Sequence, residues 1–301
     1  MIDVGVVLPT MSAGGSPGNV VAAGRHAEDL GFESVWVVDQ LVAGTGVPVL
    51  DSLTSLAAAA AVTDRVLLGV GVLILPLRPV AWVAKQVATL QHISGDRLLL
   101  GVGVGGDRHD RSWAAAGVSA RERGRLTDAA LRALPALIAG EPTRLGEEEI
   151  QLSPAATVPP IIVGGMSEAA VRRAAVHGDG WYALASPADL AAQRARLAAA
   201  VTATGRPMPS LTTNAVVAMP DDSDHVPDRA TIVTSLSDPD GMFGFPADHA
   251  EQALVYGDPR FVAGHLAEYA EAGVEQVVVT LPAGDWFRQT ELLAQAANMA
   301  S

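Results

Sequence analysis

Short apolar runs alternate along the chain with longer segments of helical periodicity, and one of these runs is repeated. The hexapeptide Leu-Leu-Gly-Val-Gly-Val stands at 67–72 and again at 99–104, 32 residues further on. That offset is about the length of one strand–helix–strand unit. Between the copies, Pro79 fits a first helical turn, and the apolar residues after it recur at helical spacing. The two copies are therefore predicted to form neighbouring parallel strands.

The same alternation predicts eight strands with helices between them. Alternating strands and helices form a parallel sheet, and eight such units fit a chain of 301 residues. We therefore expect a single α/β domain, 1–301, folded as a closed (β/α)8 TIM barrel, with an open doubly wound sheet as the alternative. The expected strands are 2–8, 34–38, 67–72, 99–104, 160–163, 180–183, 211–219 and 276–281. The expected helices are 19–30, 53–61, 79–94, 121–138, 167–176, 187–203, 261–272 and 286–297.

Two segments depart from this alternation. Segment 143–152 is predicted to form a surface hairpin around Gly146. Segment 220–259 is long, rich in Asp, Gly and Pro, and leaves the carboxyl end of the seventh strand. In a barrel, that end carries the active site. We therefore expect 220–259 to be an insertion that covers the site as a lid.

Composition narrows the class of protein. The absence of cysteine excludes disulfides, thiolate metal sites and a cysteine nucleophile. The net charge of −13 disfavours a nucleic-acid partner, and the excess of arginine over lysine is interpreted as a coding bias. The histidines lack metal-ligand spacing, so no metal site is expected. The amino terminus lacks the pattern of a secretory signal and no run is long enough to span a membrane, so we expect a cytoplasmic protein without a membrane partner.

The ends of the expected strands carry the candidate catalytic residues. Asp39 and Gln40 end the second strand, and Asp107 and His109 follow the fourth. Carboxylate and imidazole groups exchange protons near neutral pH. Asp39 could bond either loop amides or a ligand.

Glycines mark the candidate cofactor site. Segment 164–167, Gly-Gly-Met-Ser, joins a strand to a helix, where exposed amides attract phosphate; a tight structural turn is the alternative. In 101–106 the glycines are not followed directly by a helix, which argues against a dinucleotide fingerprint and favours close approach of a flat ring. Trp36 and Trp82 are expected in the core, whereas Trp181 fits either the core or the site.

Taken together, these segments resemble the bacterial luciferase-like monooxygenase superfamily, whose barrels bind FMN or the deazaflavin coenzyme F420. The resemblance runs in order over nearly the whole chain. The matching segments are 27–39, 68–73, 88–103, 122–126, 160–165, 178–181 and 272–274.

The resemblance implies roles for particular residues. Asp39 would lie against the flavin, and the Gly71–Val72 bond would form a bulge under the ring, where relatives often have a cis peptide. Residues 164–167 would hold the phosphate, and the cofactor would supply hydride chemistry. The full cofactor-binding set implied is Asp39, Gly71, Val72, Gly103, Val104, Gly105, Gly164, Gly165, Met166, Ser167 and Trp181.

Two departures from the family pattern bear on the reaction. Many F420-dependent relatives have histidine where this chain has Gln40, whose amide cannot exchange a proton near neutral pH. The sugar-phosphate dehydrogenases of the superfamily have glutamate where this chain has Gly106, so that activity is disfavoured. The catalytic candidates are therefore Gln40, Asp107 and His109.

The resemblance favours F420-dependent hydride transfer to or from a small organic substrate. An FMN-dependent monooxygenase that works with a flavin reductase is the first alternative. A cofactor-binding protein with little catalysis is the second. Dimers are common among the relatives, so a homodimer is a further expectation.

Overall fold

The computed structural model describes residues 2–11, 17–44, 46–106, 110–222 and 224–300. Within this part of the chain, eight parallel strands close into a barrel, because β9 pairs with both β8 and β11 and β11 pairs with β1. The predicted (β/α)8 barrel is thus confirmed. The barrel strands are β1 (Asp3–Val7), β2 (Ser34–Val37), β3 (Leu67–Ile74), β4 (Leu98–Gly103), β7 (Ile161–Gly164), β8 (Gly180–Tyr182), β9 (Ser210–Ala218) and β11 (Gln276–Thr280).

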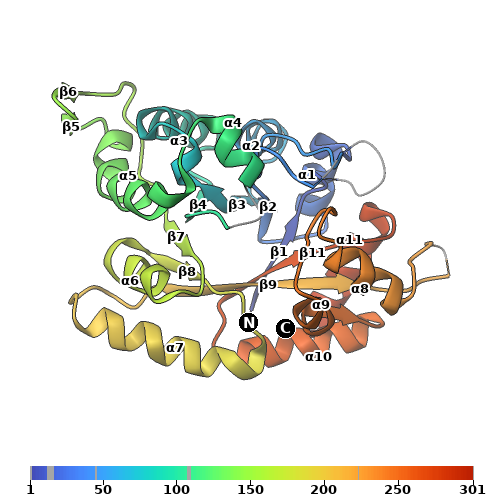
Figure 1. The fold of residues 1–301 in the computed structure, drawn as a ribbon. Coiled ribbons are helices and arrows are strands. Elements are labelled where there is room, and N and C mark those ends of the chain that lie inside the picture. The colour runs from blue at the N-terminus through green and yellow to red at the C-terminus, as the bar shows by residue number, and fades with distance from the viewer. Residues whose placement is uncertain (1, 12–16, 45, 107–109, 223, 301) are drawn as a thin grey trace.

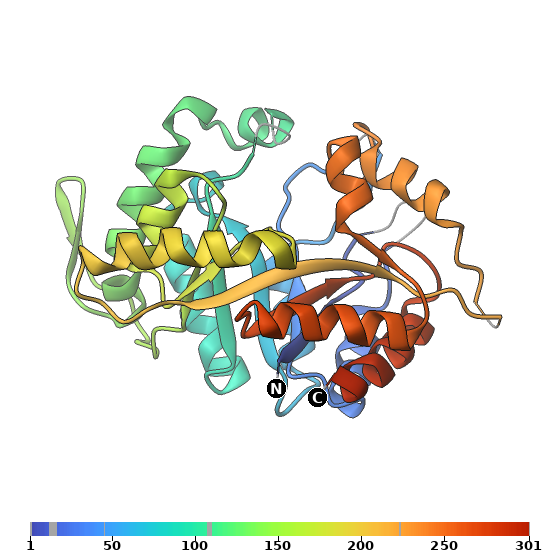
Figure 2. The same ribbon diagram turned by 90° about the horizontal axis from the view of Figure 1, so that it is seen from below.

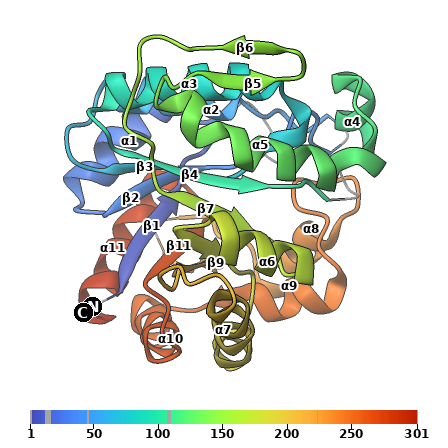
Figure 3. The same ribbon diagram turned by 90° about the vertical axis from the view of Figure 1, so that its left-hand side faces the viewer.

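Helices surround the strands on all sides, and α7 and α10 cover the outside of β9 one after the other (Figures 1, 2 and 3). Side-chain caps fix several helix starts, including the predicted cap Ser167, whose Oγ accepts from the amide of Ala170. The helix before the second repeat ends at Gly95, as predicted, with φ of 66°. The helices are α1 (Val20–Asp29), α2 (Ser52–Ala60), α3 (Val80–Ser94), α5 (Arg123–Ile138), α6 (Glu168–His177), α7 (Pro187–Thr202), α10 (Pro259–Glu271) and α11 (Trp286–Ala300).

Trp36 lies in the barrel interior, where it packs with Ile162, Tyr182 and Val278. Its indole N–H donates to Ser34 Oγ at 2.8 Å, and a Cβ at Gly69 would lie 2.2 Å from the indole ring. The absence of a side chain at Gly69 therefore makes room for the tryptophan. The prediction that Trp36 lies in the core is confirmed, whereas Trp82, expected there too, is 66 % exposed on α3.

The insertion after β9 is more regular than its sequence indicates. It contains α8 (Arg229–Ser237), α9 (Ala247–Ala253) and β10 (Leu254–Tyr256), and β10 extends the sheet along the second half of β9. Apolar side chains of these elements form a hydrophobic cluster with β9 that is separate from the main core. Those residues are Val216, Ala218, Ile232, Val233, Leu236, Ala250 and Leu254.

The smaller elements complete the fold. The predicted hairpin is confirmed as β5 (Thr143–Leu145) and β6 (Glu148–Ile150), and it lies at the opposite end of the molecule from α8 (Figure 1). Helix α4 (Asp110–Ala116) and the 3₁₀ turns η1 (Leu75–Leu77) and η3 (Ala120–Glu122) lie in the connections. None of the helices within the described ranges is long and apolar enough to cross a membrane.

Candidate functional site

The repeated hexapeptide forms a bulge in β3 at the mouth of the barrel. Strands β3 and β4 pair in register as far as Val70, and the register shifts before Leu73. The intervening Gly71–Val72 peptide bond is cis. The bulge therefore lies where the resemblance placed it.

The glycines around this bulge make room for a side chain of the protein. A Cβ at Gly103 would lie 2.6 Å from Val72 Cγ2, and one at Gly164 would lie 3.0 Å from Val72 Cγ1. Gly103 is buried, whereas Gly71, Val72 and Gly164 are half-buried. The sequence suggested that the glycines of 101–106 leave room for a flat ring. At Gly103, the side chain of Val72 occupies that room.

Asp39 holds the strand that follows the bulge. Its buried carboxylate accepts hydrogen bonds through Oδ1 from Ser52 Oγ at 2.9 Å and through Oδ2 from the Ile74 amide at 2.8 Å. Arg78 binds both oxygens, each at 2.7 Å. A fork-to-fork ion pair of this kind is strong and directional. Both carboxylate oxygens of Asp39 are thus hydrogen-bonded to protein groups, and they hold the carboxyl end of β3 in place.

The turn between β7 and α6 has the features of an anion site. Gly165 adopts φ of 116°, and Ser167 starts α6, whose first amides have no partner within the helix. Met166 is half-buried and Ser167 is exposed, so both are accessible to a ligand. The turn thus keeps the geometry that the sequence analysis expected for phosphate binding.

Trp181 supports this turn from behind. Its indole is fully buried and donates to the Gly165 carbonyl at 2.8 Å. Trp181 is thus packed by protein on all sides, and its direct contact with a cofactor stays a prediction. Through its hydrogen bond Trp181 positions Gly165, and it packs in the main hydrophobic core, whereas the next residue, Tyr182, packs in the barrel interior.

An arginine-lined hollow of about 480 Å³ adjoins the turn. Arg121, Arg123 and Arg173 line it together with Ser167 and with Val104, which follows β4. Arg173 donates from Nε to Asp128 at 2.6 Å, and this hydrogen bond holds the pKa of Asp128 below its usual value. These arginines were not predicted as site residues, because the arginine content of the whole chain is interpreted as a coding bias at the level of sequence.

Loops from three elements meet over the mouth. The amide of Val42, after β2, donates to Ser112 Oγ of α4 at 3.1 Å. A Cβ at Gly44 would lie 2.2 Å from the carbonyl oxygen of Asp240, in the connection between α8 and α9. The insertion therefore contacts the loop that carries Gln40, and its role as a lid stays a prediction.

Two further predicted residues, Gln40 and Gly105, follow the ends of β2 and β4. Gln40 is half-buried, and its side chain makes no hydrogen bond within the described part of the chain. Gly105 has φ of 72°, and a Cβ there would lie 2.9 Å from Trp113, so backbone geometry and packing explain it. Asp107 and His109 lie outside the described residues.

Polar side chains that the sequence analysis did not select lie at the same mouth. Asn214 of β9 donates from Nδ2 to the Val278 carbonyl and to Thr280 Oγ1, both at 2.9 Å. Tyr182 of β8 packs edge-on against Trp36, and burial raises the pKa of its phenol although a hydrogen bond with Asn214 opposes the shift. Tyr182 is the last residue of β8, which is the signal that could have identified it, whereas Asn214 lies in the middle of β9.

Comparison with known proteins identifies one protein family. The profile of the luciferase-like monooxygenase family matches residues 2–276. The chain is similar to two uncharacterized proteins of Mycobacterium tuberculosis: Rv0940c, with 37 % identity over 45 % of this chain and 48 % of the relative, and Rv0953c, with 28 % identity over 84 % and 95 %. The chain thus spans about half the length of the first of these relatives.

A named relative and two solved structures add to this comparison. An F420-dependent glucose-6-phosphate dehydrogenase of Beutenbergia cavernae is 34 % identical over 55 % of this chain and 52 % of its own. An F420-dependent secondary alcohol dehydrogenase in complex with an F420–acetone adduct has the same fold, with a TM-score of 0.81 and 16 % identity over 100 % of this chain and 99 % of its own. The monooxygenase RslO1 of Streptomyces bottropensis superposes with a TM-score of 0.74 and 18 % identity over 98 % of each chain.

Proposed function

Because the chain belongs to the luciferase-like monooxygenase family, we propose that it is an oxidoreductase that binds coenzyme F420 and transfers hydride to or from a small organic substrate. The family comprises flavin-type enzymes in which the cofactor supplies the redox chemistry and the protein positions it. The relative from Beutenbergia and the superposed alcohol dehydrogenase, both named as F420-dependent, support this choice of cofactor.

The observation that carries the proposal is the arginine-lined hollow beside the phosphate turn. FMN ends at its phosphate, whereas F420 continues from its phosphate into a chain with further carboxylates. Residues 164–167 suit the phosphate that both cofactors share. Arg121 and Arg123, next to that turn, suit the additional anionic groups of F420.

The residues of the mouth have defined tasks in this proposal. F420, when bound, acts as the two-electron hydride carrier. Val72 projects from the bulge on one side of the mouth, and Trp36 with Tyr182 closes the barrel below it, which excludes water. The carboxamide of Gln40 can bond a substrate oxygen without exchanging a proton. Proton exchange with the substrate is assigned to Asp107 or His109.

Cofactor titration tests the proposal. Purified protein is titrated with F420 and, separately, with FMN, while quenching of cofactor fluorescence is followed. F420 is expected to bind more tightly. Tight binding of FMN without binding of F420 would refute the proposal and favour the monooxygenase that needs a flavin reductase. Tight F420 binding with no substrate-dependent change in its redox state would favour a cofactor-binding protein.

A pair of arginine variants tests the role of the hollow. Arg121→Gln removes a charge that lines the hollow, and we expect F420 affinity to fall by about two- to fivefold, as for other exposed ion pairs. FMN affinity should change less, because FMN lacks the additional carboxylates. Arg125→Gln is the matched control, since Arg125 is exposed at the start of α5, four residues after Arg121, and pairs with Glu122. Equal effects of the two variants would contradict the assignment.

A further inference from the structure

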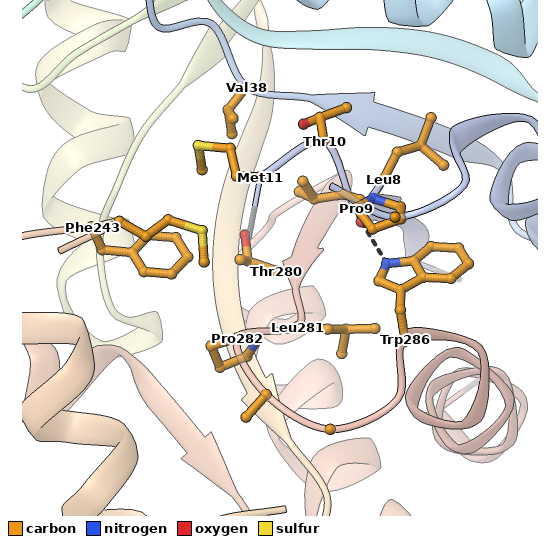
Figure 4. A pocket seen from close by; sticks show the side chains of 15 residues that line it. Leu8, Pro9, Thr10, Met11, Val38, Phe243, Thr280, Leu281, Pro282 and Trp286 are labelled. Atoms are coloured by element: carbon orange, nitrogen blue, oxygen red, sulfur yellow. Dashed lines mark hydrogen bonds between the residues drawn. The ribbon is translucent and has the colours of Figure 1, made fainter. Parts of the chain in front are cut away.

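A second cavity, of about 210 Å³, lies at the carboxyl ends of β1 and β11 (Figure 4). Met242 and Phe243 from the insertion line one side of it, and Trp286 of α11 lies on the other. The cavity is next to the mouth, because Val38 in its lining directly precedes Asp39. Val7, also in its lining, packs against the same barrel-interior cluster as Val72. The cavity therefore adjoins the proposed cofactor site.

The side chains that line this cavity are uncharged and mostly apolar. Among the described residues that line it, none carries an ionisable side chain. The indole N–H of Trp286 is already used, because it donates to the Val7 carbonyl at 2.9 Å. A carboxylate or phosphate that entered would lose its hydration without meeting a counter-charge. The lining thus selects against anions, in contrast to the arginine-lined hollow on the other side of the mouth.

One polar atom in the lining lacks a partner. Thr10 is fully buried, and its Oγ1 makes no hydrogen bond with any part of the chain that the structure describes. The backbone of Thr10 is satisfied, since its amide donates to the Leu8 carbonyl and its carbonyl accepts from the Leu50 amide. Buried hydroxyl groups in proteins nearly always have a partner, so the exception calls for one.

A second hydroxyl faces the same space. Thr280 Oγ1 accepts a hydrogen bond from Asn214, which leaves its own proton to be donated elsewhere. Figure 4 shows Thr280 between Phe243 and Thr10, with its oxygen directed into the space between them. An oxygen atom on a bound molecule can therefore meet a hydroxyl group in an otherwise apolar cavity.

From this lining we propose that the substrate is a small, uncharged and mostly apolar molecule whose single carbonyl or hydroxyl oxygen is bound by Thr10 Oγ1. This inference rests on the proposed function. The cavity is somewhat larger than the apolar cavity of about 150 Å³ that holds benzene. A monocyclic or short-chain ketone or alcohol fits this size and polarity. Sugar phosphates and carboxylic acids do not.

The test uses three probes of matched shape and the protein without added cofactor. Cyclohexanone has the oxygen, methylenecyclohexane lacks it, and cyclohexanecarboxylate adds a charge. Methyl-labelled methionine reports where each probe binds, since Met11 and Met242 line the cavity whereas Met208 and Met299 lie on the outer surface. Cyclohexanone is expected to shift the methyl signals of Met11 and Met242 and to leave Met208 and Met299 unchanged. Cyclohexanecarboxylate is expected to shift none of them.

Variants of Thr10 then test the hydrogen bond. Thr10→Val replaces the hydroxyl by a methyl group, and the affinity for cyclohexanone should fall by about fivefold, the loss of one neutral hydrogen bond. Binding of methylenecyclohexane should hold or improve. Thr10→Ser keeps the hydroxyl, so its affinity for cyclohexanone should stay within about twofold of the wild type. Thermal unfolding of both variants verifies that the fold is retained.

The results that overturn this inference differ from those that overturn the proposed function. Shifts of Met11 and Met242 by the carboxylate, or unchanged affinity for cyclohexanone in Thr10→Val, would refute the substrate class. Absence of shifts with every probe would refute the cavity as a binding site. The fluorescence titrations with F420 and FMN report on the cofactor alone. Failure of either proposal is therefore recognisable without the other.

Discussion

The ion pair between Asp39 and Arg78 gives the sharpest quantitative prediction. Substitution Asp39→Asn keeps the size of the side chain and removes its charge. The amide offers one acceptor oxygen where the carboxylate offers two, so the guanidinium of Arg78 loses its buried partner. The Ile74 amide, directly after the bulge, also loses its acceptor if the remaining oxygen turns toward Ser52.

The magnitude follows from the burial of the pair. The side chain of Asp39 is 1 % exposed and that of Arg78 is 20 % exposed. Breaking a buried ion pair by removing one partner costs about 3–5 kcal/mol. The lower end of this range applies here, because Asp51, 3.6 Å from Arg78, still partly compensates the guanidinium. We therefore expect Asp39→Asn to lower the free energy of unfolding by about 3 kcal/mol. Arg78→Met should cost a similar amount, because the buried carboxylate keeps its hydrogen bonds from Ser52 and Ile74 but loses its counter-charge.

Urea unfolding followed by circular dichroism measures this loss. The control is Asp51→Asn, which touches the same guanidinium: Asp51 Oδ2 lies 3.6 Å from Arg78 and its side chain is 50 % exposed. Asn caps helices about as well as Asp does, so α2 should keep its cap. The free energy of unfolding should therefore change by less than about 1 kcal/mol. Wild-type stability of Asp39→Asn combined with a collapse in F420 affinity would refute the reasoning, and would assign the carboxylate to the cofactor.

Other features yield predictions of comparable sharpness. Gly69→Ala places a Cβ 2.2 Å from the ring of Trp36 and should lower the free energy of unfolding by about 2 kcal/mol, measured by urea unfolding; an unchanged midpoint would show that the ring can move. Trp181→Phe removes the hydrogen bond to the Gly165 carbonyl and should cost about 1 kcal/mol in thermal unfolding together with weaker F420 binding; tighter binding would contradict its supporting role. Burial is the main cause that lowers the pKa of His177 below 6.5, and nearby arginines lower it further. The imidazole is therefore protonated at a higher pH in the unfolded chain than in the folded protein. Stability should therefore be full above pH 6.5 and decline below it, and urea unfolding between pH 5 and pH 8 should show a shallower decline in His177→Gln.

The sequence predicted the barrel because parallel strands are buried on both faces and so appear as short apolar runs between turn residues. The strands expected at 276–281 and 211–219 match β11 and β9 to within one residue at each end. Prediction was poorer in the insertion. Helix α9 buries only Ala250 and α8 buries three side chains, so neither has the apolar stripe that identifies a helix.

The site was predicted less completely than the fold, because its contacts join residues that are distant in sequence. Asp39 meets Arg78 across 39 positions, and Arg173 meets Asp128 across 45. Nor does the sequence say what fills the space beside a glycine. At Gly103 that is the Val72 side chain from the neighbouring strand, which depends on the register shift in β3.

The separate hydrophobic cluster of the insertion divides the molecule into parts that can evolve independently. Ile232, Val233 and Leu236 pack with the far end of β9, away from the helices that surround the rest of the barrel. Met242 and Phe243, which line the proposed substrate cavity, belong to the connection between α8 and α9. Substitutions there alter the cavity while leaving the core of the barrel untouched. Selection or laboratory evolution can thus change the substrate through this insertion without first acquiring stabilising mutations elsewhere.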